Sequence, residues 1–229
     1  MIFYPESISK VRAILLLLIF LFAQSASLAA GPLQSHRGKA GVYLRIAEKE
    51  ENDPELRRII LSNPLIDCIV LGANWGEIER EEGHFDFSKI KKLVADWSAS
   101  GKHVLIKVVC YGQMEDDRFT PSWIYKKKDI RKISFSGGGA AMGASVQIPL
   151  VWDKSFNKYL SPFLREFAKT FDGDPRVWYI HPAFGHIGHL TAQPSKGGAA
   201  PLLAAGWTVR RWQEYCLSTS ALYRSLFKK

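Results

Sequence analysis

Segments typical of strands and of helices alternate along this chain, and this alternation limits its fold more than any other feature. Strand patterns occur at 41–46, 68–75, 103–110 and 177–183. Helix patterns begin at Asp53, cover 86–100, recur around 156–167 and cover 208–226. Such alternation is typical of α/β proteins with parallel sheets and right-handed crossovers. The sequence therefore predicts four parallel β/α units, either half of an eight-unit barrel or a small open sheet.

Local signals support these assignments. Asp53 precedes Pro54, which is the usual order of an N-cap and a first helical residue. The near-continuous apolar run at 68–75 suits a strand buried on both faces. In the last helix one predicted apolar face combines Val209, Trp212, Tyr215 and Cys216.

The long segment between the third strand and the next helix, 111–152, is expected to be an irregular excursion. Loops of that length are usually functional or disordered. In the helix that follows, Pro162 predicts either a kink or a restart with Ser161 as the cap.

The N-terminal segment is predicted to be a secretory signal peptide covering 1–30, followed by one domain over 31–229. Lys10 and Arg12 precede the apolar run 13–22, and small residues follow up to Ala30. The expected location is therefore secreted or periplasmic. An uncleaved or lipid-modified anchor is the alternative, although the apolar run is shorter than the roughly 20 residues that span a bilayer.

Composition narrows the classes of partner. The formal net charge is +9, but the basic residues are scattered and their longest run is 126–128. No nucleic-acid motif is present, so no nucleic-acid partner is expected. Cys68, Cys110 and Cys216 are too few and too scattered for a disulfide framework and are interpreted as small buried apolar residues.

The fourth strand is followed by the turn Phe-Gly-His-Ile-Gly-His, which presents His186 and His189. Sites in parallel β/α proteins lie just beyond the carboxyl ends of strands. A metal bound by His181, His186 and His189 is one reading, but the spacing is not helical and no acid is adjacent. Neither a metal nor another cofactor is expected.

The segment 74–87 reads Asn-Trp-Gly-Glu-Ile-Glu-Arg-Glu-Glu-Gly-His-Phe-Asp-Phe. It resembles a signature of glycoside hydrolases with a (β/α)8 barrel, particularly the β-galactosidase-like members. Val-Trp-Asp at 151–153, Phe-Asp-Gly-Asp-Pro-Arg-Val at 171–177 and the turn at 185–188 match this family in the same order. The resemblance covers roughly 40–195 and implies a partial TIM barrel corresponding to the N-terminal half.

The resemblance further implies a sugar-binding cleft and two catalytic carboxylates. In the family the acid/base Glu follows the fourth strand and the nucleophile follows the seventh. In this sequence His189 lies near the position of the acid/base Glu. The position of the nucleophile has no counterpart. His189 is therefore either a replacement acid/base, a sugar contact together with His186, or a structural turn residue.

Further candidates for contact with a sugar are aromatic or polar. They are Trp75, Glu77, Tyr111, Trp123 and Gln193. Core packing is the alternative for Trp75, and a salt-bridged loop acid is the alternative for Glu77. Asp153 could bind hydroxyls or only cap the helix that begins near Lys154.

Three functions remain open from the sequence. The first is a truncated hydrolase-like barrel that is inactive alone. The second is an active hydrolase assembled with a second half-barrel chain or as a homo-oligomer. The third is a non-catalytic carbohydrate-binding or cell-surface protein. The sequence contains no nucleotide-binding fingerprint and no Ser/His/Asp elbow.

Overall fold

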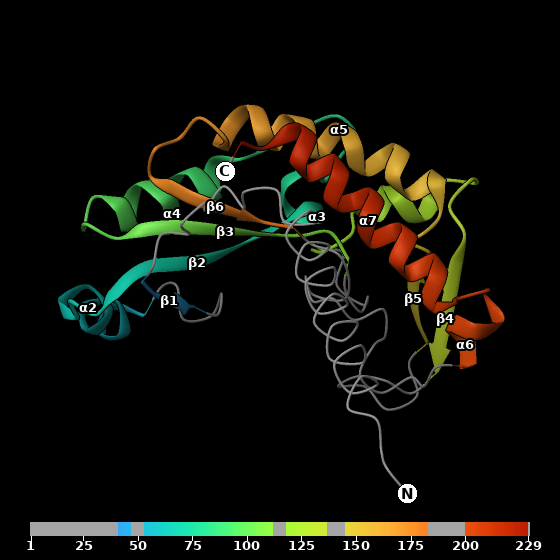
Figure 1. Cartoon of the computed structure of the whole chain (residues 1–229), viewed down its shortest axis with the longest axis horizontal. Coiled ribbons are helices and arrows are strands. Elements are labelled where there is room, and N and C mark those ends of the chain that lie inside the picture. Colours follow the sequence, from blue (N-terminus) through green and yellow to red (C-terminus); the bar gives the residue numbers. More distant parts are fainter. Residues whose placement is uncertain (1–40, 47–52, 112–117, 137–144, 183–199, 229) are drawn as a thin grey trace, which may run out of the picture. The chain divides into compact units, whose positions relative to one another are not determined.

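A computed structural model describes residues 41–46, 53–111, 118–136, 145–182 and 200–228, all in one compact unit beginning at Gly41. The elements, in chain order, are β1 (Val42–Arg45), α2 (Pro54–Ser62), β2 (Ile66–Asn74), α3 (Trp75–Ile78), α4 (Ser88–Ser98), β3 (His103–Val109), η2 (Ser122–Lys126), β4 (Lys132–Ser136), β5 (Ser145–Pro149), α5 (Lys154–Phe171), β6 (Val177–His181), α6 (Ala200–Ala204) and α7 (Val209–Leu226). Figure 1 shows their arrangement. The predicted signal peptide lies outside the described residues.

The main sheet has four strands in the order β1-β2-β3-β6, and every neighbouring pair is parallel. The strands follow one another in chain order, with a helical crossover between each pair. This confirms the predicted α/β class and the four β/α units. β2 and β3 form the centre of the sheet, in register from Cys68 opposite His103 to Asn74 opposite Val109.

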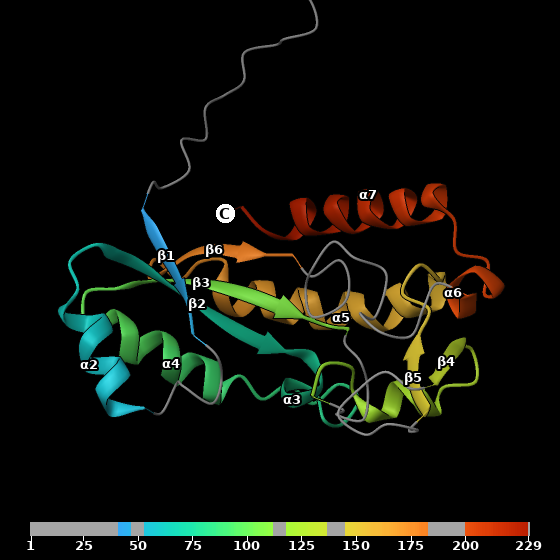
Figure 2. The same cartoon turned by 90° about the horizontal axis from the view of Figure 1, so that it is seen from below.

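Helices α4 and α5 together contribute ten buried residues to the core. Ile90, Val94 and Trp97 recur on the buried side of α4, as the helical spacing predicts. Seven residues of α5 are buried: Phe156, Leu160, Phe163, Leu164, Phe167, Ala168 and Phe171. α7 contacts α5, and the pairs Trp152–Trp212 and Phe167–Phe227 join the two ends of this contact (Figures 1 and 2).

The excursion after β3 is more ordered than expected. β4 and β5 form an antiparallel pair, with Lys132 opposite Pro149 and Ser136 opposite Ser145, and the short 3₁₀ helix η2 precedes them. Apolar residues alternate with polar ones in β4 (Ile133, Phe135) and in β5 (Val146, Ile148), a pattern typical of strands that the sequence analysis left within an irregular segment. This alternation and the antiparallel pairing of two neighbouring segments define the second sheet.

Three predictions about helices and strands need correction. α5 runs without a restart through Pro162, and the Ser161 hydroxyl donates to the Asn157 carbonyl at 2.7 Å instead of capping a new helix. In α7, Val209 is 61% exposed, so it does not belong to the buried face with Tyr215. Trp75, expected to end the second strand, instead begins α3.

The main sheet is curled. β1 and β6 are its two outer strands, separated by β2 and β3. A flat sheet would place them about 14 Å apart at the usual strand spacing. Yet the ring of Tyr43 on β1 lies 6.4 Å from that of Trp178 and 6.3 Å from that of Tyr179 on β6. Side chains of the two outer strands therefore meet across a concave face.

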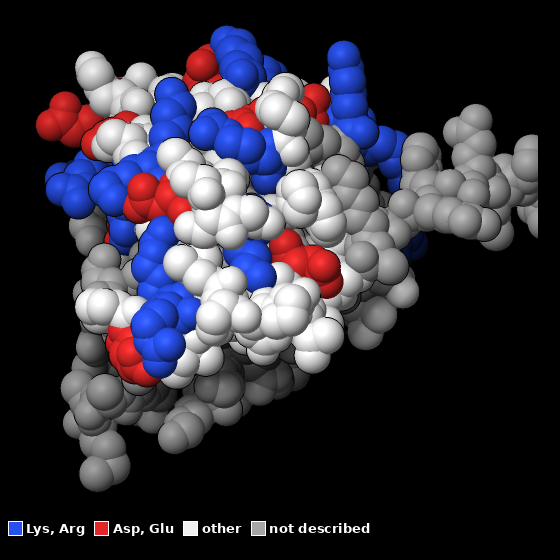
Figure 3. Space-filling view, turned by 90° about the vertical axis from the view of Figure 1, so that its left-hand side faces the viewer, with Lys and Arg blue, Asp and Glu red and all other residues white. Residues whose placement is uncertain are grey.

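Charges on the described surface are mixed. Figure 3 shows basic side chains interleaved with acidic and uncharged ones on the side of the molecule that carries α2. Several basic groups pair locally, among them Arg58 with Glu55 and Arg176 with Asp174. In the part of the chain that the structure describes, no helix is both long and apolar enough to cross a membrane.

Candidate functional site

The carboxyl end of β2 positions a half-buried carboxylate. Asn74 is the last residue of this strand, and Glu77 follows it on the short helix α3. Asn74 Nδ2 donates to Glu77 Oε2 at 3.0 Å, and Lys89 Nζ on α4 lies 3.8 Å from the same oxygen. The Glu77 side chain is 23% exposed, so these two contacts orient it while leaving part of it accessible.

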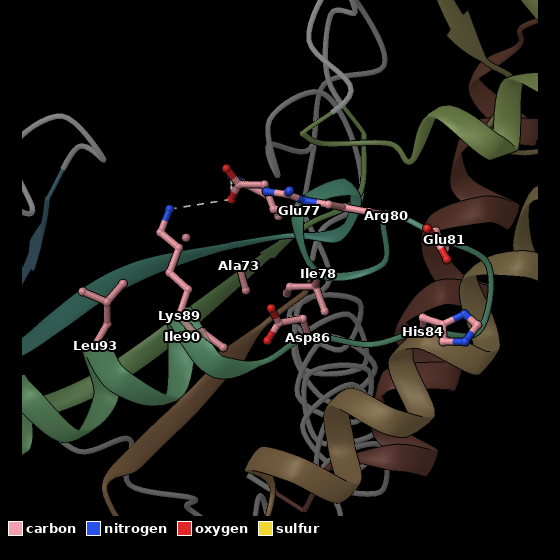
Figure 4. Close-up of a pocket in the computed structure, with 12 residues that line it drawn as sticks. Ala73, Glu77, Ile78, Arg80, Glu81, His84, Asp86, Lys89, Ile90 and Leu93 are labelled. Atoms are coloured by element: carbon pink, nitrogen blue, oxygen red, sulfur yellow. Dashed lines mark hydrogen bonds and ion pairs between the residues drawn. The ribbon is translucent and has the colours of Figure 1, made fainter.

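Glu77 lines a cavity of about 450 Å³ between β2, α3 and α4 (Figure 4). The other lining residues are Gly72, Ala73, Asn74, Ile78, Arg80, Glu81, His84, Asp86, Lys89, Ile90 and Leu93. One wall is apolar and the rest bears groups of both charges. This volume and mixture suit a small polar ligand with some apolar surface.

Asp86 supplies a second carboxylate to this cavity. Its side chain accepts a hydrogen bond from the Ser88 backbone N–H at 2.9 Å, at the start of α4. Hydrogen bonds from Ser88 hold the pKa of Asp86 below its usual range. Asp86 is therefore a charged hydrogen-bond acceptor at neutral pH.

Glu79 is a buried carboxylate that the sequence analysis did not single out. It is 2% exposed. Its two carboxylate oxygens accept from Trp75 Nε1 at 2.5 Å and from the Gly83 N–H at 2.8 Å. Burial raises its pKa, while these hydrogen bonds act in the opposite direction. Its partners mark Glu79 as the residue that holds the turn after α3.

Trp75 lies in the core. Its ring stacks on Phe163 at 5.7 Å and meets Phe156 and Trp123 edge-on, and the side chain is fully buried. Trp75 therefore packs in the core, which was the alternative to sugar contact in the sequence analysis. Its ring has no surface that a ligand could contact. Tyr111 is likewise only 2% exposed, and burial raises its pKa.

Trp123 is half-buried and lies away from Glu77. Its Nε1 donates to the Glu79 carbonyl at 2.9 Å, and the ring is flanked by Tyr159 and Lys127. It lines a second cavity of about 290 Å³ on the side of α5. The structure therefore separates Trp123 from Glu77 rather than joining them in one cleft.

The remaining candidates divide into two groups. His186, His189 and Gln193 lie outside the described residues, so their predicted roles stay predictions. Asp153 caps α5 through the Ser155 N–H and pairs with Arg131 at 2.6 Å, which accounts for its position. Among the described residues, no cluster of three or more His, Cys, Asp or Glu is arranged to hold a metal.

Comparison with known proteins gives a fold but no family. No family model and no curated protein sequence matches the chain. The catalytic domain of β-amylase from Paenibacillus polymyxa is similar with a TM-score of 0.52 at 19% identity, over 74% of this chain and 41% of that one. A β-galactosidase from Marinomonas ef1 has a TM-score of 0.43 at 14% identity, and the match covers 68% of this chain and 23% of that one. A GH5_18 protein from Bifidobacterium longum subsp. infantis has a TM-score of 0.45 at 11% identity, and the match covers 78% of this chain and 38% of that one.

The β-amylase comparison supports the fold assignment. At this identity the similarity concerns the fold alone, which consists of parallel β/α units that correspond to part of a TIM barrel. The chain spans less than half the length of each of these structures. In TIM barrels the carboxyl ends of the strands carry the site, which is where Glu77 lies.

Proposed function

We propose that this chain binds carbohydrate in the cavity beside the carboxyl end of β2. The observation that carries the proposal is the placement of Glu77: a half-buried carboxylate, oriented by Asn74 and Lys89, on the wall of a 450 Å³ cavity. The partial TIM-barrel fold supports the location, because ligands of such folds bind at this edge of the sheet.

The lining of the cavity fits the chemistry of a sugar. Each sugar hydroxyl can both donate and accept a hydrogen bond. Glu77 and Asp86 offer acceptors, while Lys89 and Arg80 offer donors. A pyranose ring also has apolar C–H faces, and the apolar wall supplies contacts for these. That wall consists of Ile78, Ile90 and Leu93.

Binding, rather than hydrolysis by these residues alone, is the function we propose. Glycoside hydrolysis uses two carboxyl groups on opposite sides of the scissile bond, roughly 5 to 10 Å apart. Glu79 is hydrogen bonded within its own turn, so it is not available as the partner of Glu77. Asp86 shares the cavity with Glu77, but hydrogen bonds from Ser88 lower its pKa, which makes it a hydrogen-bond acceptor and a poor proton donor. We therefore propose recognition of a sugar, and turnover at these two carboxylates is an outcome that the test below must distinguish.

The test begins with a panel of plant and microbial oligosaccharides, followed by calorimetry with the tightest of them. We expect Glu77→Gln to weaken binding about tenfold or more, because the loss of one charged hydrogen bond costs about 1.5 kcal/mol or more. Lys91→Gln, on the exposed side of α4 and outside the cavity, is the matched control and should bind as the wild type does.

Two results would overturn this proposal. The first is a folded protein that binds no member of the panel, or binds it equally well after Glu77→Gln. The second is turnover of nitrophenyl glycosides by the wild type that Glu77→Gln abolishes, because that result would assign hydrolysis to the same cavity. Circular dichroism of each variant confirms that the fold is retained.

A further inference from the structure

We infer that Arg45 and Lys107 form a binding site for a small oxyanion, such as a carboxylate or a sulfate, on the concave face of the main sheet. Arg45 is the last residue of β1, and Lys107 belongs to β3. Strand β2 runs between them and bears Gly72 at the register position of Lys107. The inference does not depend on the proposed sugar site, although Gly72 also lines that cavity.

The register of the strands places both basic residues on one face of the sheet. Tyr43 and His103 lie at the same level on either side of β2, and both of their rings contact Trp178 on the concave face. Side chains alternate between the two faces along a strand. Arg45 therefore belongs to the concave face, because it follows Tyr43 by two residues. Lys107 belongs to it as well, because it follows His103 by four.

Lys107 is a buried cation without a partner in the part of the chain that the structure describes. It is 9% exposed, and no described group accepts a hydrogen bond from its ammonium or forms an ion pair with it. Lys102 is buried to the same degree, at 8% exposed, but its Nζ donates to the Asn63 and Ile66 carbonyls at 2.8 Å each. A buried charge that lacks such partners is costly. The Lys107 ammonium therefore has donors to offer to a ligand.

The charge that acts on Lys107 has the same sign as its own. Burial lowers the pKa of Lys107, and the positive charge of Arg45 lowers it further. At its own level in the sheet Lys107 lies between Gly72 and His181, neither of which is acidic. Glu77, beyond the end of β2, is already held by Asn74 and Lys89. An anion beside Lys107 and Arg45 would offset both the burial of the ammonium and the repulsion between the two cations.

Gly72 leaves room for that anion. It lies beside Lys107 and two residues beyond Val70, the register partner of Arg45. A Cβ at Gly72 would meet only the Asn74 Oδ1, at 4.0 Å, so the space above this glycine is open. Arg45 and Gly72 are both exposed, which gives a ligand access. A guanidinium can bind a planar oxyanion with two parallel hydrogen bonds, and an ammonium adds a compact charge.

The first test is equilibrium dialysis of the full chain with radiolabelled sulfate, at an ionic strength kept constant with chloride. We expect one saturable site per chain. Lys107→Met keeps the length of the side chain and removes its charge, so it should weaken sulfate binding at least tenfold. Arg45→Gln, at an exposed position, should also weaken it. Lys91→Gln removes a positive charge from the exposed side of α4 and is the control, with sulfate affinity unchanged.

The oxyanion has two possible sources, a free ion or the carboxylate of an acidic sugar, and calorimetry distinguishes them. The probes are sulfate, trigalacturonate and the neutral galactotriose. An acidic sugar is the source if trigalacturonate binds at least tenfold more tightly than the other two and loses this advantage in Lys107→Met. A free ion is the source if sulfate binds as tightly as trigalacturonate. Glu77→Gln should not weaken sulfate binding, so failure of the sugar proposal would leave this inference standing.

Urea denaturation gives an independent readout. In buffer that contains chloride alone, Lys107→Met should unfold at a higher urea concentration than the wild type, because it removes a buried charge that lacks a partner. Sulfate should reduce this difference by stabilising the wild type more than the variant.

Three results would overturn the inference. The first is a folded wild type that binds neither sulfate nor trigalacturonate. The second is binding of these anions that Lys107→Met and Arg45→Gln leave unchanged. The third is a Lys107→Met variant that is less stable than the wild type in chloride alone, because that result would show that the ammonium has a structural partner.

Discussion

Trp75 Nε1 and the Glu79 carboxylate are joined by a hydrogen bond of 2.5 Å, four residues apart at the point where the chain leaves β2. The same carboxylate accepts from the Gly83 N–H, and the Glu79 carbonyl accepts from Trp123 Nε1. Gly83 has a φ of 78°, a conformation that glycine adopts without strain. Glu79 thus connects the core indole, the turn and the excursion after β3.

Removing the Glu79 side chain should destabilise the protein strongly. In Glu79→Ala the buried Trp75 indole N–H and the partly exposed Gly83 N–H lose their acceptor, and we expect the free energy of unfolding to fall by about 2–3 kcal/mol. Glu79→Gln keeps the shape and one acceptor oxygen, so its cost should be smaller. Urea denaturation measures both values. Equal stability of Glu79→Ala and the wild type would show that the network contributes nothing.

Stability should also depend on pH through Glu79. Burial raises the pKa of this group in the folded state above its unfolded value of about 4.3. The contribution of Glu79 is therefore fully present below the unfolded pKa and declines as the pH rises through the folded pKa, by up to about 1.4 kcal/mol per pH unit.

The measurement is the difference in unfolding free energy between the wild type and Glu79→Gln from pH 4 to pH 8. The wild type should lose stability relative to the glutamine variant as the pH increases. A difference that is constant, or that moves in favour of the wild type at high pH, would contradict the raised pKa.

The three thiols should differ in reactivity. Burial raises the pKa of Cys68 to about 12 and also raises that of Cys110, so neither forms thiolate at pH 8. Cys216 is only half-buried. Titration with a chromogenic disulfide should modify Cys216 in the native protein and all three thiols in denaturant. Rapid native labelling of Cys68 would show that the β1-β2 region opens easily.

Replacing Pro162 should stabilise α5. Proline inside a helix lacks the N–H that would donate to the carbonyl four residues earlier, that of Lys158. Pro162 is exposed, so Pro162→Ala adds a backbone hydrogen bond with little loss of packing. We expect an increase of about 1–3 kcal/mol in unfolding free energy, measured by thermal or urea denaturation.

Ser161→Ala is the control for this change, because it removes only the hydroxyl bond to Asn157 and should alter stability by less than about 0.5 kcal/mol. A decrease in stability for Pro162→Ala would mean that the ring itself packs in the adjoining surface cavity, which it lines.

The sequence by itself determined the order of strands and helices and the α/β class. The signals responsible are local: Asp53 and Thr208 cap α2 and α7, and apolar residues at helical spacing define α4. Local sequence also placed Glu77 just beyond a strand, and its contacts with Asn74 and Lys89 match the salt-bridged alternative for that residue.

Only the tertiary structure decided which of these polar and aromatic side chains are buried. Trp75 and Glu79 lie four residues apart in one segment, and no periodicity distinguishes a core indole from a ligand contact or a buried acid from a solvated one. Packing of α5 against α3 buries both, and pairing of β4 with β5 orders the excursion that the sequence left as a loop. The contact between Trp75 and Phe163 joins residues far apart in the chain, so local patterns cannot reveal it.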